Sequence, residues 1–366
     1  MTSLRYSPRI NRLIRQDAPE DLGQPTQVFL EAAIREGQPD EARKWLDYLL
    51  NEQAHVVGIY AVWNWYMVRY YLDRKPEAMF ADLLRLSLAP WLGTTAGLVG
   101  HPVASVTADG TSGRLDVGAV SLHLNEGIER FELTIDSSDA QASRRAQWRA
   151  RAETAMAAGD VEEFRRLLDH YLRTEGWLIH DIHADWSWAL LSVCAREWGE
   201  EVLDEVLRVT EEPWVTRRYA AIADMSAEES LQLTIEGMRG HFTGPGRAGH
   251  IFVTEEADRY VMSFDACGSG GRMRRGDVLV GSGSRLDAPY CFLNAVEAHD
   301  WTWNRKNVCA YCGHCAMVNQ ILPIENLGHP MRMVEYPEDA QDPCRWIIYK
   351  DPATYPHEAF ARVGKG

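Results

Sequence analysis

Apolar residues recur at steps of three and four positions in two stretches of the chain, residues 31–55 and residues 153–177. This spacing places the apolar side chains on one face of a helix, so both stretches are predicted to be helical. Gly37 and Gly159 interrupt the two patterns, and each is predicted to end one helix before the next begins. The apolar positions are Trp45, Leu46, Leu49 and Leu50 in the first stretch and Phe164, Leu167, Leu168, Tyr171 and Leu172 in the second.

Segments with strand-like alternation of apolar and polar residues follow the helices in each half of the chain. Residues 114–135 and Ile251–Phe264 predict antiparallel hairpins, the second of which turns at residues 255–258. Arg332–Tyr336 and Arg345–Lys350 predict two further strands. We therefore expect an α+β fold in which helices precede an antiparallel sheet in each half.

The two halves share identical residues at matching positions, which predicts an internal duplication. Residues 31–55 align with residues 153–177, and the pairs Trp63-x-Trp65 and Pro90-Trp91 align with Trp186-x-Trp188 and Pro213-Trp214. We expect residues 1–145 to be a degenerate repeat that serves as a scaffold. Residues 146–366 are expected to carry the metal site and the substrate pocket.

The second copy alone carries the side chains suited to chemistry. Cys267 stands where the first copy has Ser138, and His180 and His183 stand where it has Val57 and Tyr60. The cysteine-rich segment 309–344 has no counterpart in the first copy. The site is therefore expected only in the second half.

Composition limits the class of protein. The 366 residues carry a formal net charge of −15, which argues against nucleic-acid or anionic-membrane partners because these require a basic face. No apolar run approaches the roughly 20 residues of a membrane span, and the first residues lack an apolar segment, so we expect no secretory signal. Its seven cysteines are an odd number and cluster late in the chain. We expect a cytoplasmic protein whose cysteines are metal ligands or catalytic thiols.

The cysteine cluster is the strongest chemical signal. Cys309, Cys312 and Cys315 are three residues apart, so they lie close together on a helix or a series of turns. Cys267 follows one predicted strand and Cys344 precedes another, and the ends of neighbouring strands can meet. We expect Cys267, Cys312, Cys315 and Cys344 to bind one Zn²⁺, with Cys309 and His314 as alternate ligands. An iron–sulfur cluster and metal-free redox thiols are the alternatives.

Other residues are candidates for catalysis and substrate binding. His180 and His183 share a helix face and are expected to act as a general base or as ligands at an open metal position, with Asp181 and Asp265 beside them. The glycine-rich segment 267–271 is followed by Arg272, which we expect to hold an anionic group. The aromatic residues expected to line the substrate pocket are Trp186, Trp303 and Tyr311.

Residues 250–350 resemble the ligand-binding fold shared by L-2-amino-thiazoline-4-carboxylic acid hydrolase-like and 4-vinyl-reductase-type domains. The segments that carry the resemblance are Val308–Asn319, Gly328–Glu335 and Asp342–Tyr349. The chain differs from those families in its additional Cys309 and in Trp346, where they have Phe. The resemblance implies a small-molecule pocket and a cysteine-bound metal.

Together these features predict a zinc-dependent hydrolase or ring-opening enzyme that acts on a small organic acid or heterocycle. An iron–sulfur oxidoreductase and a non-catalytic small-molecule sensor are the other two classes. The expected partner is a small molecule with an anionic group, and a homodimer is an open possibility. No nucleic acid or membrane is expected as a partner.

Overall fold

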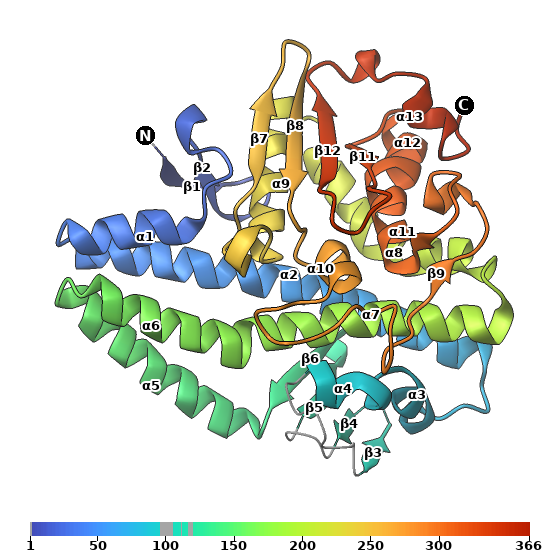
Figure 1. Cartoon of the computed structure of the whole chain (residues 1–366), viewed down its shortest axis with the longest axis horizontal. Helices are drawn as coiled ribbons and strands as arrows, with labels where there is room; N and C mark the ends of the chain where they lie inside the picture. Colours follow the sequence, from blue (N-terminus) through green and yellow to red (C-terminus); the bar gives the residue numbers. More distant parts are fainter. Residues whose placement is uncertain (1, 96–104, 111, 116–119) are drawn as a thin grey trace.

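Two long helices, α2 (Pro39–Arg74) and α7 (Trp177–Trp198), run side by side through the middle of the molecule (Figure 1). The computed structural model describes residues 2–95, 105–110, 112–115 and 120–366. Almost every side chain of α7 from Trp177 to Ala195 is buried. A helix that is enclosed on all sides must satisfy its polar side chains with protein partners, and α7 carries two histidines and two aspartates.

The elements have the following bounds. The helices are α1 (Thr26–Arg35), α2 (Pro39–Arg74), α3 (Phe80–Ser87), α4 (Ala89–Thr95), α5 (Ser138–Ala157), α6 (Val161–Tyr171), α7 (Trp177–Trp198), α8 (Val202–Ile222), α9 (Ala227–Gly240), α10 (Gly270–Arg275), α11 (Gly313–Ala316), α12 (Leu322–Leu327) and α13 (Glu358–Ala361). The strands are β1 (Ser3–Ser7), β2 (Arg12–Gln16), β3 (Val106–Asp109), β4 (Ser112–Leu115), β5 (Val120–Asn125), β6 (Arg130–Ile135), β7 (Phe252–Glu255), β8 (Arg259–Phe264), β9 (Asn294–Ala295), β10 (Val308–Cys309), β11 (Met333–Glu335) and β12 (Cys344–Tyr349).

Two four-stranded antiparallel sheets lie on opposite sides of the long helices (Figure 1). One has the order β3-β4-β5-β6, and the other has the order β11-β12-β8-β7. In the second sheet β12 pairs with β8 so that Cys344 stands opposite Phe264. This register brings Cys344 close to Cys267, which follows β8 after a short turn.

The structure confirms the α+β class and most of the expected elements. The hairpins β5–β6 and β7–β8 and the strands β11 and β12 lie where alternation predicted them. Residues 116–119 of the first predicted hairpin region fall outside the described residues. Gly37 and Gly159 follow the ends of α1 and α5 with φ values of 67° and 70°, a conformation that suits glycine at a helix end.

The internal duplication of the chain, and its division into two repeats after residue 145, remain predictions. In the first half α1 precedes the long helix α2, and in the second half α5 and α6 precede the long helix α7. A four-stranded sheet follows later in each half. The largest hydrophobic core takes residues from both sides of the expected boundary, from Val56 to Val363. A second core, made by α1, α2, α5 and α6, also joins both halves.

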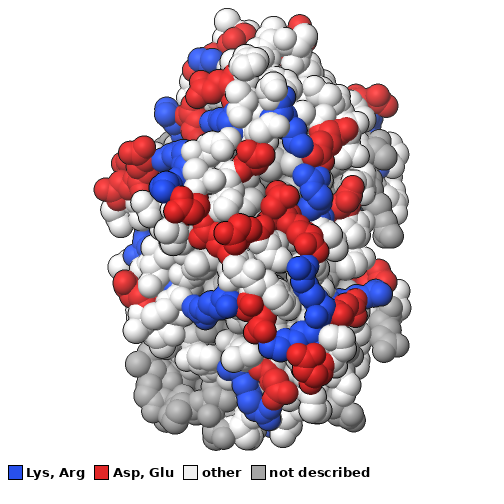
Figure 2. Space-filling view, turned by 90° about the vertical axis from the view of Figure 1, so that its right-hand side faces the viewer, with Lys and Arg blue, Asp and Glu red and all other residues white. Residues whose placement is uncertain are grey.

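The surface carries both signs of charge. On the face in Figure 2, basic and acidic side chains are interspersed, and acidic side chains gather across its middle. Among the described residues, no helix has the length and apolar character needed to cross a bilayer.

Candidate functional site

Four of the expected metal ligands line one cavity, which we call the thiol cavity. Cys267, Cys312, Cys315 and Cys344 all face this space of about 60 Å³. They arrive from three parts of the fold: the turn after β8, the segment that leads into and through α11, and the start of β12. The pairing of β12 with β8 and the tight turns of the Cys-x2-Cys segment bring them together. All seven cysteines are free thiols.

The thiols lie close enough to influence one another's protonation. Burial, and then the neighbouring Cys312, Cys344 and Cys267, raise the pKa of Cys315 well above its ordinary value. Burial and the same neighbours act likewise on the pKa of Cys344. Such buried thiols resist becoming anions together unless a cation compensates their charge.

The segment after Cys267 packs directly onto the sulfurs. The Gly271 N–H donates a hydrogen bond of 2.9 Å to Cys267 Sγ. A Cβ atom at Gly270 would come within 2.6 Å of Cys312 Sγ, so any larger residue there would collide with the thiol. N–H groups directed at sulfur stabilise thiolates and tune the metals that they bind.

The alternate ligands Cys309 and His314 occupy different positions. Cys309 is fully buried and does not line the cavity. Its thiol hydrogen-bonds to that of Cys312, and this bond, together with the Arg274 charge, lowers the pKa of Cys312 against the effect of burial. His314 lines the cavity. Within the described part of the chain, no three His, Cys, Asp or Glu side chains are grouped so that they could hold one metal ion.

His314 is paired with a buried carboxyl group that sequence reasoning missed. His314 Nδ1 lies 2.9 Å from Glu211 Oε1 of α8, and the imidazole stacks on Trp63 at 4.6 Å. Glu211 is fully buried. Burial raises the pKa of Glu211 to about 7, although His314 opposes the rise. A carboxyl group that titrates near neutrality suits proton transfer at the cavity wall.

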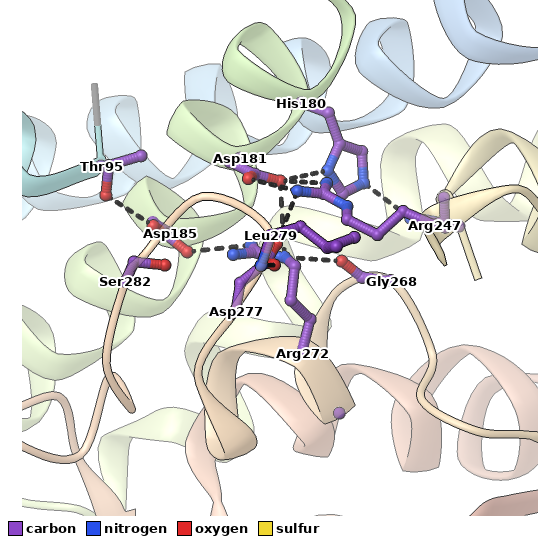
Figure 3. A network of polar contacts seen from close by, with 12 residues as sticks. Thr95, His180, Asp181, Asp185, Arg247, Gly268, Arg272, Asp277, Leu279 and Ser282 are labelled. Atoms are coloured by element: carbon purple, nitrogen blue, oxygen red, sulfur yellow. Dashed lines mark hydrogen bonds and ion pairs between the residues drawn. The ribbon is translucent and has the colours of Figure 1, made fainter. Parts of the chain in front are cut away.

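A second polar region lies across α7, and we call it the closed charge network. It comprises Asp181, Asp185 and Asp277 with Arg247, Arg272 and Arg285 (Figure 3). Arg247 donates two hydrogen bonds, of 2.7 and 2.8 Å, to the Asp181 carboxylate. Burial alone would raise the pKa of Asp181, but the charges of Arg247 and Arg272 hold it well below its ordinary value. Three carboxylates face three guanidinium groups, so the network is neutral.

The remaining contacts of this network involve Asp185. Arg272 Nη2 lies 3.2 Å and Arg285 Nη2 lies 3.0 Å from its carboxylate oxygens. Thr95 donates a further hydrogen bond of 2.8 Å to it. Arg272, expected to hold a substrate anion, is therefore already occupied by aspartates, and it lines no part of the thiol cavity.

Several other expected site residues lie away from the thiol cavity. His180 is fully buried, with Nδ1 at 3.0 Å from Asp181 Oδ1, and burial lowers its pKa. His183, also buried, lies near Asn64 and has a pKa lowered to about 3 by burial and then by His180. Asp265 is exposed and pairs with Arg275. Trp186 is buried in the hydrophobic core, and its indole N–H donates a hydrogen bond to Ser87 Oγ. Neither histidine therefore faces the four thiols.

Trp303 and Tyr311 do line the thiol cavity, as expected. The Tyr311 hydroxyl lies 2.6 Å from the Tyr60 hydroxyl, which in turn lies 3.2 Å from Nδ1 of His241. His241 Nδ1 also lies 3.4 Å from His180 Nε2. A chain of polar contacts thus joins the closed charge network to the cavity wall.

His241 and Glu211 are site residues that the sequence did not predict. Neither belongs to a recognisable motif, and each gains its role from partners far away in the chain. The sole local signal was the Pro213-Trp214 pair beside Glu211, which had indicated only the repeat.

Comparison of the chain with protein-family models, with curated proteins and with solved structures finds no match. The resemblance of residues 250–350 to the hydrolase-like and reductase-type domains therefore stays a prediction.

Proposed function

We propose that the chain is an oxidoreductase that holds an iron–sulfur cluster at Cys267, Cys312, Cys315 and Cys344 and acts on a small organic acid. The single observation that carries the proposal is the meeting of these four thiols, from three separate segments, at one buried cavity. Thiolates are the usual ligands of such clusters.

One observation disfavours a single metal ion: among the described residues, no group of three or more donors could hold one. Zinc bound at about 2.3 Å to four sulfurs holds them only about 3.8 Å apart. No three described donors are grouped in that way, so zinc binding would require the side chains to move together. A cluster would place its own irons and sulfides between the four cysteines, which line one cavity. Arg274 also lines the cavity and supplies positive charge toward an anionic cluster.

A bound cluster would supply one-electron transfer. The residues around it would tune and complete the site: the Gly271 N–H stabilises thiolate at Cys267, and Glu211 with His314 can hold or release a proton at the wall. Free thiols suit a reducing compartment, so we also propose a cytoplasmic location. All four cysteines lie in the second half of the chain. This is expected if the first half is a degenerate repeat that has no site of its own.

The zinc-dependent hydrolase is the second candidate, and one observation favours it. Zinc-ligating histidines are commonly oriented by a carboxylate on their other ring nitrogen, and His314 is held in that manner by Glu211. A zinc ion there would activate water or polarise a substrate carbonyl.

The visible absorption spectrum of anaerobically purified protein separates the candidates. We expect thiolate-to-iron charge-transfer bands in the wild type, their loss in Cys344→Ala, and their retention in Cys291→Ser, whose exposed thiol lies outside the cavity. Colourless protein with one zinc per chain would support the second candidate. Wild-type protein that contains neither iron nor zinc would contradict both.

A further inference from the structure

A larger cavity of about 560 Å³ adjoins the thiol cavity, and we call it the arginine cavity. The two cavities share Met238, His241, His314 and Trp346 as wall residues. Its walls come from the turn between β1 and β2, from α2, α8 and α9, and from the π-helical turn Met317–Ile321. Its volume is that of a site for a small molecule.

The charged side chains in this cavity are all of one sign. Its described wall residues include Arg9, Arg12, Arg218 and Arg332 and no Asp or Glu, although the whole chain has 53 acidic and 38 basic residues. Arg12 is paired with Glu236, which lies outside the cavity wall. The cavity is therefore a local positive site in an acidic protein.

Arg218 and Arg332 keep their charge without a carboxylate partner. Arg332 donates to Thr234 Oγ1 at 2.6 Å and to Asn319 Oδ1 at 2.7 Å, and both acceptors are neutral. Arg218 lies over the Trp214 ring at 5.0 Å, and no described carboxylate is within ion-pair distance of either guanidinium group. Asn319 and Thr234 thus orient Arg332 without neutralising it.

The surroundings of both guanidinium groups disfavour their charged form. Burial, followed by the charges of Arg12 and Arg332, lowers the pKa of Arg218 to about 10. Burial likewise lowers the pKa of Arg332 to about 10. Both groups remain protonated at neutral pH, so the cavity holds two uncompensated positive charges. Partly desolvated guanidinium groups bind carboxylates strongly because two parallel hydrogen bonds can form.

The rest of the wall is flat and apolar. Trp63, Trp214 and Trp346 line it, together with Tyr60 and Tyr219. Indole and phenol rings favour a planar ligand that can stack on them. Gly237 also lines the cavity, and a Cβ atom there would meet no other atom within 4 Å.

We propose that the arginine cavity binds a small aromatic carboxylate, with the carboxylate held by Arg218 and Arg332 and the ring placed among the tryptophans. As a statement of the substrate class this rests on the proposed function, because the ligand would lie beside the thiol cavity. The binding itself does not require the metal.

The test is calorimetric titration of the full chain with 2-naphthoate and with the neutral 2-naphthamide. We expect the acid to bind at least ten-fold more tightly than the amide. Arg332→Met and Arg218→Met should each lower the affinity for the acid by about ten-fold or more. Arg208→Met, on the same helix as Arg218 but paired with Glu325 outside the cavity, should bind as wild type. Inorganic phosphate should bind more weakly than the acid.

A second variant blocks the cavity without changing charge. Gly237→Leu should fill open space on α9, abolish naphthoate binding and leave the thermal midpoint of unfolding the same or higher, because leucine favours a helix over glycine. Equal binding of acid and amide, absence of acid binding, or unchanged affinity in Gly237→Leu would overturn the proposal. Tighter binding of phosphate than of naphthoate would overturn the aromatic assignment. Naphthoate binding by protein without iron would leave this proposal standing while the cluster proposal fails.

Discussion

Two regions of the molecule use the arginine side chain in opposite ways. In the closed charge network, Arg247, Arg272 and Arg285 meet three aspartates and leave no charge uncompensated. In the arginine cavity, Arg218 and Arg332 meet only aromatic rings and neutral acceptors. The first region is complete without a ligand, whereas the second has the charge and space for one.

Two buried carboxyl groups, those of Asp181 and Glu211, also differ in how well their charge is compensated. Asp181 has a pKa well below its ordinary value because the charges of Arg247 and Arg272 outweigh burial. Glu211 has only His314 as partner, and burial raises its pKa to about 7. Buried groups with full partners hold the fold together, and those without full partners are the candidates for function.

The largest effect is expected in the closed charge network, with Arg208, which lies outside both regions, as the control. Arg285→Met removes a fully buried guanidinium group that contacts Asp185 through two nitrogens, so it should destabilise the protein by about 3–5 kcal/mol. Urea unfolding measures the effect. Arg208→Met, which breaks a half-exposed pair with Glu325, should cost under about 1 kcal/mol. Equal costs for the two variants would show that the network does not hold the fold.

The pH dependence of stability should have opposite signs for the buried carboxyl groups of Glu211 and Asp181. Because the folded pKa of Glu211 lies above its ordinary 4.5, its contribution is full below pH 4.5 and is lost as the pH rises through 7. The loss amounts to about 3 kcal/mol. The difference in stability between Glu211→Gln and wild type should therefore shift in favour of the variant by that amount between pH 4.5 and pH 8. Urea midpoints at the two pH values measure the shift, and parallel profiles would contradict the burial argument. Asp181, with its lowered pKa, contributes stability that is lost as the pH falls.

The smallest effect is expected for Arg218→Met. This guanidinium group has no described carboxylate to leave behind and is exposed to its cavity, so its removal should change the free energy of unfolding by no more than about 1 kcal/mol, toward higher stability. The same urea titration that detects a large loss for Arg285→Met provides the measurement. A loss of several kcal/mol for Arg218→Met would remove the distinction between the two regions.

The sequence predicted the thiol cavity because its signal is partly local. Cys312 and Cys315 are three residues apart in the chain. Alternation also predicted the strand that ends before Cys267 and the strand that begins near Cys344, and these two strands pair in the structure. The α+β class followed from the same patterns of alternation and helical spacing.

The roles of the arginines could not be read in the same way. Arg272 follows a glycine-rich turn, a pattern that predicts the binding of an anionic ligand. Its actual partners, Asp181 and Asp185, come from a helix far earlier in the chain. Arg332 had no such motif, yet it lies beside the cavity. Only the packing of distant segments decides which arginine meets a carboxylate, and no spacing rule reports it.

The central proposal for this protein is that the four thiols of the thiol cavity bind an iron–sulfur cluster. Quantitation of iron, acid-labile sulfide and zinc in the anaerobically purified full chain tests it most directly. We expect several irons per chain with a matching amount of sulfide and little zinc. Stoichiometric zinc without sulfide, or protein with neither metal, would contradict it.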